Sequence, residues 1–220
     1  AFLSKLAAIP PPAARGASRG RLMFAMDATA SRQPTWDAAS NIQAQMFEET
    51  AALGGLDVQL CYYRGFKEFQ ATSWVNDAKT LLSTMTSVSC AAGTTQIGRV
   101  LQHAVTETKR RRINALVFVG DCMEEDIDKL CGVGGELGLL GVPVFVFHEG
   151  FDAAAEKTFK QLAKLTQGAY CRFDAASAAQ LRDLLSAVAV YAAGGRPALE
   201  NFGKRRGGIA LRLTHQINKS

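Results

Sequence analysis

The stretch LMFAMDATAS, residues 22–31, decides how this chain is expected to fold. Five apolar residues run without interruption up to Asp27, a pattern typical of a strand that is buried on both faces of a sheet. Two hydroxyl side chains, Thr29 and Ser31, follow the acid at alternate positions. Carboxylate and hydroxyl oxygens are hard donors that suit a cation such as Mg²⁺. The stretch therefore predicts a buried strand that ends at an oxygen-lined loop.

The segments that follow alternate between strand and helix patterns. Further strands are expected at VQLCYY (58–63), INALVFVG (113–120), VPVFVFH (142–148) and AYCRF (169–173), and FKEFQATSW (66–74) predicts an antiparallel edge strand. Helices are expected over residues 36–53, 76–86, 97–108, 124–140, 152–166 and 181–188. Apolar strands separated by helices indicate a doubly wound α/β domain with a mostly parallel sheet.

Ligands of such a sheet bind beyond the carboxyl ends of the strands, where successive connections depart in opposite directions. Asp27 and Asp121 each follow a buried strand at that end. The loop CAAGTTQIG (90–98) adds Thr94 and Thr95, and its glycine allows a close approach of the backbone. Each polar residue taken alone is also consistent with a helix cap or a turn. Together they form an oxygen-rich set that suits Mg²⁺, or Mn²⁺.

These motifs resemble the von Willebrand factor type A (VWA) domain over roughly residues 21–193. DATAS is similar to its Asp-x-Ser-x-Ser motif, GTTQIG to its Gly-Gly-Thr-Asn-Ile-Gly loop, and VFVGD to the end of its fourth strand. The resemblance implies a Rossmann-like six-stranded sheet of order 3-2-1-4-5-6 with one antiparallel edge strand. It also implies a metal-ion-dependent adhesion site (MIDAS) formed by Asp27, Thr29, Ser31, Thr95 and Asp121. The alignment selects Thr95 over Thr94, and Thr29 keeps the hydroxyl of the serine it replaces.

The function that this resemblance implies is Mg²⁺-dependent protein binding without catalysis. In the family, an Asp or Glu of the partner protein often completes the shell of the ion. An alternative is a haloacid dehalogenase-like phosphatase, because DATAS also resembles the nucleophile loop of that superfamily and GDCMEED (120–126) resembles its acidic motif. Asp27 would then attack a phosphoryl group, and Asp121 and Asp126 would hold Mg²⁺, while the lysine of the superfamily would be either Lys109 or absent.

Charge and cysteine content limit the remaining possibilities. The positive charge is concentrated in two end segments: residues 1–20, an expected linker or N-terminal arm, carry +3, and residues 194–220, an expected basic tail, carry +5, while the chain as a whole has a net charge of +5. We expect solvated arms, which argues against nucleic acid as the partner. No stretch reaches the roughly 18 consecutive apolar residues of a membrane span. The five cysteines form no CxxC pair, which favours the cytoplasm. Nothing in the sequence indicates an oligomeric state.

Overall fold

The computed structural model describes residues 19–173, 178–208, 213, 216 and 217. The strands are β1 (Gly20–Asp27), β2 (Leu56–Arg64), β3 (Glu68–Ala71), β4 (Ala115–Gly120), β5 (Val144–Glu149) and β6 (Ala169–Phe173). The helices are η1 (Ala30–Arg32), α2 (Gln33–Ile42), α3 (Ala44–Thr50), η2 (Ala51–Leu53), α4 (Ala78–Thr86), α5 (Ile97–Arg110), α6 (Ile127–Leu139), α7 (Ala153–Leu165) and α8 (Ala178–Arg206). Most of the expected N-terminal arm, and several residues of the expected tail, lie outside the described residues.

The six strands form one sheet in the order β3-β2-β1-β4-β5-β6. β2 and β3 are antiparallel, and every other pair of neighbours is parallel. The predicted α/β fold, its strand order and its antiparallel edge strand are therefore confirmed. The chain leaves β1 toward β2 but leaves β4 toward β5, so the connections depart in opposite directions at the β1–β4 pair. Asp27 and Asp121 both stand at the carboxyl end of this pair.

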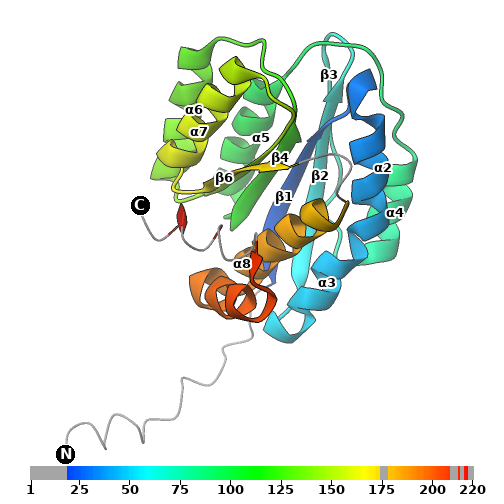
Figure 1. The fold of residues 1–220 in the computed structure, drawn as a ribbon, viewed down its shortest axis with the longest axis vertical. Coiled ribbons are helices and arrows are strands. Elements are labelled where there is room, and N and C mark those ends of the chain that lie inside the picture. The colour runs from blue at the N-terminus through cyan, green and yellow to red at the C-terminus, as the bar shows by residue number, and fades with distance from the viewer. Residues whose placement is uncertain (1–18, 174–177, 209–212, 214–215, 218–220) are drawn as a thin grey trace, which may run out of the picture.

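Helices cover both faces of the sheet, which explains why β1 is apolar throughout. Figure 1 shows α2, α3, α4 and α8 on one face and α5, α6 and α7 on the other. Leu22 and Phe24 of β1 pack in the core beneath the first set, while Met23 and Ala25 pack beneath the second. Because both sides of the strand are buried, its sequence does not alternate between apolar and polar residues.

The helix expected over residues 36–53 is present but divided. α2 ends at Ile42, α3 begins at Ala44, and η2 continues as far as Leu53. Gly54 then adopts a φ of 100°, in the left-handed region that favours glycine. The expected end of this helical segment is thus confirmed, although its interior is not one continuous helix.

α8 extends well beyond the final helix expected over residues 181–188. Gly195 interrupts it with a φ of 68°, and Pro197 lies in the first turn of a second helical stretch, where proline is tolerated. Leu199 and Phe202 of this stretch are buried in the core. The first part of the expected tail therefore packs onto the domain, and its cations are presented from a helix.

Two compositional features can be compared with the structure. All five cysteines have free thiols. None of the helices within the described ranges combines the length and the apolar character needed to cross a membrane.

Candidate metal centre

Asp27 ends β1 with its carboxylate almost completely buried, at 1% exposure. The backbone N–H of Thr29 donates a hydrogen bond of 2.7 Å to Oδ1 of Asp27, and the hydroxyl of Tyr63 donates one of 3.2 Å to Oδ2. Burial raises the pKa of Asp27, and the negative charge of Asp121 raises it further, against the lowering effect of these hydrogen bonds. The loop after β1 is thereby folded around a carboxylate that has little contact with water.

Asp121 follows β4, the parallel neighbour of β1. Ser31 donates a hydrogen bond of 3.3 Å to Oδ2 of Asp121, and Nη2 of Arg32 lies 3.2 Å from the same oxygen. The other oxygen, Oδ1, is buried and has no hydrogen-bond partner among the described residues. A buried carboxylate oxygen without a partner is uncommon in proteins, and this one lies at the point where a cation ligand was predicted.

Thr95 lies against the loop that follows Asp121. Its hydroxyl accepts a hydrogen bond of 3.1 Å from the backbone N–H of Glu124, and its own N–H donates one of 3.2 Å to the carboxylate of Glu124. Thr95 is buried, whereas Thr94 is exposed. These contacts tie Thr95, rather than its neighbour, to the β4–α6 loop.

Glycine brings the loop of Thr95 close to the rest of this edge. A Cβ atom on Gly93 would lie 2.1 Å from the carbonyl oxygen of Gly65, in the turn between β2 and β3. The N–H of Thr94 donates a hydrogen bond of 3.1 Å to that same carbonyl. The expected close approach of this loop is confirmed, because no larger residue fits at position 93 without moving the backbone.

Glu125 is a further anchor that the sequence analysis did not identify. Its carboxylate accepts hydrogen bonds from the backbone N–H groups of Ile97 and Gly98, at the start of α5. An anion at the N-terminus of a helix satisfies free N–H groups and interacts favourably with the helix dipole. Glu124 and Glu125 together fix the β4–α6 loop against the loop of Thr95. Their position directly before α6 was the available signal.

Arg32 and Glu149 also belong to this centre, although neither was predicted from the sequence. Arg32 directly follows Ser31, yet its side chain turns inward and is only 9% exposed. It forms a buried ion pair with Glu149 at the carboxyl end of β5, and the hydroxyl of Thr35 donates to the same carboxylate oxygen. The candidate metal centre thus contains a guanidinium group that contacts two carboxylates, Asp121 and Glu149.

His148 of β5 contacts the backbone of Asp121. Its Nε2 lies 3.0 Å from the backbone carbonyl oxygen of Asp121, and its Nδ1 lies 2.8 Å from the hydroxyl of Tyr170. Because a carbonyl oxygen only accepts, Nε2 carries the proton of the neutral ring, and Nδ1 accepts from Tyr170. Burial lowers the pKa of His148. This histidine is a buried support for the backbone rather than a free ligand.

The predicted ligands are therefore gathered at one edge of the sheet, in two groups. Hydrogen bonds join Ser31 to Asp121 and Thr29 to Asp27, while Thr95 is joined to the Asp121 loop through Glu124. Within the part of the chain that the structure describes, no three His, Cys, Asp or Glu side chains are arranged to hold a metal ion. A metal centre here would depend on hydroxyl oxygens as much as on carboxylates.

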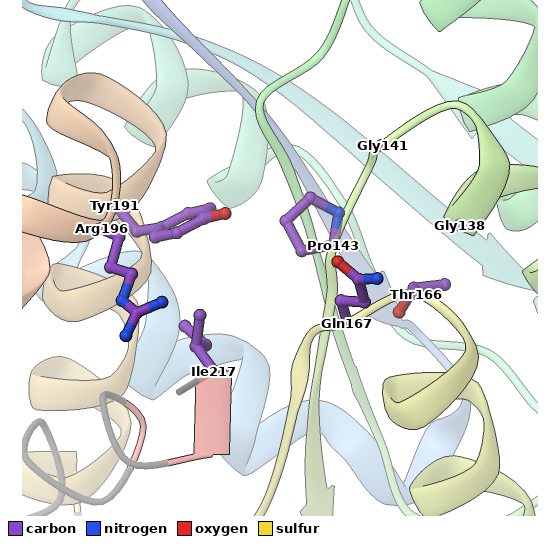
Figure 2. A pocket seen from close by; sticks show the side chains of 8 residues that line it. All are labelled: Gly138, Gly141, Pro143, Thr166, Gln167, Tyr191, Arg196 and Ile217. Atoms are coloured by element: carbon purple, nitrogen blue, oxygen red, sulfur yellow. The ribbon is translucent and has the colours of Figure 1, made fainter. Parts of the chain in front are cut away.

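A cavity of about 200 Å³ lies at the opposite edge of the sheet. Figure 2 shows Tyr191 and Arg196 of α8 on one side of it, with Pro143 and Gln167 on the other. Pro143 and Gln167 come just before β5 and β6, at the amino ends of the strands. This cavity is consequently separate from the candidate metal centre, which lies at the carboxyl ends.

No protein-family model matches the chain, and no curated protein sequence does. Solved structures do match it. A von Willebrand factor type A protein from Catenulispora acidiphila superposes with a TM-score of 0.64 at 14% identity, over 79% of this chain and 43% of the other. The chain has a VWA-like fold. It spans less than half of that first structure.

Two further VWA-like neighbours bear on the candidate centre. The VWA domain of SpRpn10 matches with a TM-score of 0.58 at 14% identity, over 77% of this chain and 93% of that one. Proximal thread matrix protein 1 from the mussel byssus, with a zinc-occupied MIDAS motif, gives a TM-score of 0.60 at 13% identity, over 79% and 46% of the two chains. At these identities the likeness establishes the fold alone, and the metal belongs to that neighbour.

Proposed function

We propose that the chain is a VWA-like protein-binding module whose candidate metal centre holds Mg²⁺, or Mn²⁺, and recognises an acidic side chain of a partner protein. The proposed ligands are five oxygen-bearing residues, acting directly or through water: Asp27, Thr29, Ser31, Thr95 and Asp121. A bound ion of this kind supplies positive charge and keeps waters that an incoming carboxylate can replace. We further propose that the module acts in the cytoplasm and catalyses no reaction.

One observation carries this proposal: within the described part of the chain the buried Oδ1 of Asp121 has no hydrogen-bond partner, and the charge of Asp121 acts on a second carboxylate, Asp27, that is itself buried. Burying a charged oxygen without a compensating partner is costly, and a cation is the partner that would remove this cost. The donors nearby are hydroxyls and carboxylates, which suit Mg²⁺ and Mn²⁺ better than soft metals. The residues present therefore fit such an ion.

The acidic character of the edge supports a metal-dependent mode of binding. Glu124, Glu125 and Asp126 lie between β4 and α6, and Asp152 precedes α7 at the same edge. The negative charge of these two loops attracts a cation, while Arg64 at the same end of the sheet is already paired with Glu68. This negative charge also repels an acidic partner as long as no cation is present, so recognition of a carboxylate would require the ion.

The contacts of Asp126 and Lys109 favour this proposal over the phosphatase alternative. Asp126, its second metal ligand, accepts a hydrogen bond of 3.0 Å from the N–H of Lys129 and caps α6. Lys109 lies in the last turn of α5 and pairs with Glu136 at 2.7 Å. Since α5 runs antiparallel to the parallel strands, its last turn lies at the edge opposite Asp27. The helical turn η1 also begins only three residues after Asp27, which leaves little room for a flap.

Crystals soaked in Mn²⁺ would test the metal centre directly. We expect one anomalous peak between the β1–α2 loop and Asp121, within contact distance of Ser31 and Asp121. Crystals of Ser31→Ala, soaked in the same way, test one proposed ligand. This exposed hydroxyl contributes little to the fold, so its loss should weaken the anomalous peak without disturbing the structure. A peak elsewhere, or none at high Mn²⁺ concentration, contradicts the proposal.

A further inference from the structure

Arg32 places a positively charged side chain in the candidate metal centre. Its Nη2 lies 3.2 Å from Oδ2 of Asp121, and its Nη1 donates to Oε2 of Glu149. The side chain is 9% exposed, so these contacts are little screened by water. A single guanidinium therefore joins a proposed metal ligand on the β4 side to a carboxylate that no proposed metal contact uses.

Asp121 and Glu149 differ in the hydrogen bonds that they accept from residues other than Arg32. Glu149 also accepts a hydrogen bond from the hydroxyl of Thr35, and its side chain is 11% exposed. Asp121 also accepts from Ser31 through Oδ2, but its Oδ1 has no partner among the described residues. Glu149 thus keeps one charged contact to Arg32, through Nη1, that does not depend on Asp121, whereas Asp121 remains short of one contact.

The local charges point in the same direction. Two carboxylates, Asp121 and Glu149, contact the one guanidinium, and the negative charge of Asp121 also acts on the buried Asp27. These carboxylates carry more negative charge than one guanidinium balances, so a divalent ion can bind while Arg32 stays in place. The guanidinium therefore need not be expelled when an ion binds, but it has to share or give up Asp121.

We propose that the guanidinium of Arg32 competes with a metal ion for Asp121, and that this competition sets the metal affinity of the centre. Arg32 pairs with both Asp121 and Glu149 when the centre is empty of metal, and it retains only Glu149 when Asp121 becomes a metal ligand. Glu149 makes the exchange possible, because a buried guanidinium that lost its only partner would be strongly unfavourable. This inference rests on the proposed metal centre and adds to it a residue that governs affinity.

Removing the two partners of this ion pair has opposite effects on metal binding. Arg32→Gln removes the competing cation, so Asp121 is available and Mg²⁺ binding tightens by about tenfold or more. Glu149→Gln leaves Arg32 with Asp121 as its only carboxylate, so Mg²⁺ binding weakens several-fold. Both variants destabilise the metal-free protein, since Arg32→Gln leaves Glu149 without its cation and Glu149→Gln removes one of the two carboxylates that pair with Arg32. Calorimetric titration of the full chain with Mg²⁺, together with thermal unfolding in chelator, measures both effects.

Arg64→Gln is the matched control. Arg64 also lies at the carboxyl edge, at the end of β2, but it pairs with Glu68 and the carbonyl of Ser89 instead of a proposed ligand. Its removal changes the net charge by the same amount and should alter Mg²⁺ affinity by less than about twofold. A change equal to that of Arg32→Gln would mean that the effect is only one of overall charge, which overturns the inference.

The remaining outcomes separate this inference from the proposed function. Mg²⁺ binding by the wild type with unchanged affinity in Arg32→Gln overturns the role of Arg32 and leaves the metal centre standing. Binding by Arg32→Gln alone supports the role of Arg32 and shows that the native chain does not function through the metal. If neither the wild type nor Arg32→Gln binds Mg²⁺, both the role of Arg32 and the proposed metal centre are overturned. If Arg32→Gln does not fold, the double variant Arg32→Met/Glu149→Gln removes both charges together, and it should also bind Mg²⁺ more tightly than the wild type.

Discussion

Ser31 donates a hydrogen bond of 3.3 Å to Oδ2 of Asp121, although 90 positions separate the two residues in the chain. One residue belongs to the helical turn that follows β1, and the other follows β4. Parallel pairing of β1 with β4 brings the two loops to the same edge, and this single contact spans the switch point of the sheet. The candidate metal centre is therefore a consequence of strand order.

Asp27→Asn should remove most of the stabilisation that Mg²⁺ gives to the fold. Asparagine is preferable to alanine because Asp27 is buried and holds Tyr63 and the N–H of Thr29. An ion present at 100 times its dissociation constant stabilises a protein by about 2.7 kcal/mol. Thermal unfolding with Mg²⁺ and with chelator measures this difference. A variant that keeps the full Mg²⁺ response would exclude Asp27 as a ligand.

Asp126→Ala should lower the stability of the fold and leave its stabilisation by Mg²⁺ unchanged. The carboxylate of Asp126 caps α6, and the loss of an N-terminal cap costs about 1 kcal/mol of unfolding free energy. The response to Mg²⁺ should remain, because this carboxylate is committed to the helix. Chemical denaturation with and without Mg²⁺ distinguishes the two effects. A lost Mg²⁺ response in this variant would favour the phosphatase arrangement, in which Asp126 is a metal ligand.

The purified chain should not hydrolyse small phosphoesters in the presence of Mg²⁺. Asp27 is enclosed by Tyr63 and the Thr29 backbone, and Lys109 is paired at the other edge of the sheet. Colorimetric assay of an aryl phosphate is sufficient. Turnover that disappears in Asp27→Asn would identify an enzyme, whereas turnover that survives in this variant would indicate a contaminant.

Much of the fold could be predicted because its signals are local. The uninterrupted apolar strands imply burial on both faces, and Gly54 ends its helix through a local backbone preference. The second half of α8 escaped prediction for a related reason. Gly195 does break the helix, but Leu199 and Phe202 restart an apolar face only three residues apart, in a segment rich in glycine and cations.

The candidate centre could be predicted only in part. Asp27, Ser31 and Asp121 are recognisable because each follows a strand in a known order. The pairing of Arg32 with Glu149 is not, because 117 positions separate the two residues and the inward turn of Arg32 depends on where β5 ends in space. An arginine next to a polar loop is ordinarily expected to point into water.

Stability of the metal-free protein should fall as the pH is lowered below about 6.5, the ordinary pKa of histidine. Burial lowers the pKa of His148 and of His103 in the folded state, so the unfolded chain binds more protons in this range. The stability is fully present above the unfolded pKa and is lost progressively as the pH falls toward the folded one. Thermal unfolding in chelator between about pH 7 and pH 5 follows this loss.

His148→Gln should flatten part of that slope, and His103→Gln should flatten the rest. Glutamine can keep a contact to the carbonyl of Asp121 but does not titrate. His103 lies on α5 beside Gln59, away from the candidate centre, so His103→Gln measures the contribution of a histidine that does not contact Asp121. An unchanged slope in both variants would assign the pH dependence to carboxylates instead.

Recognition of a partner should require both Mg²⁺ and an acidic side chain on that partner. Without the ion, the acidic loops before α6 and α7 repel a carboxylate. Capture of partners by the immobilised chain should therefore be lost in chelator, return when Mg²⁺ is added back, and be absent with Asp27→Asn as bait. Candidates that meet all three conditions can then be scanned for the one Asp or Glu whose amide variant no longer binds.

The basic segment of α8 should contribute separately. Lys204 and Arg205 are exposed near the end of α8. That helix passes the amino end of the sheet, where Gly20 contacts the backbone of Ala192, so these cations lie away from the candidate centre.

Any attraction between these cations and an acidic partner should fade as ionic strength approaches about 1 M, where the Debye length is about 3 Å. Lys204→Gln/Arg205→Gln should remove this salt-sensitive part and preserve the Mg²⁺ requirement. Binding that is lost in this variant yet persists in chelator would identify the basic segment, and not the metal, as the recognition element.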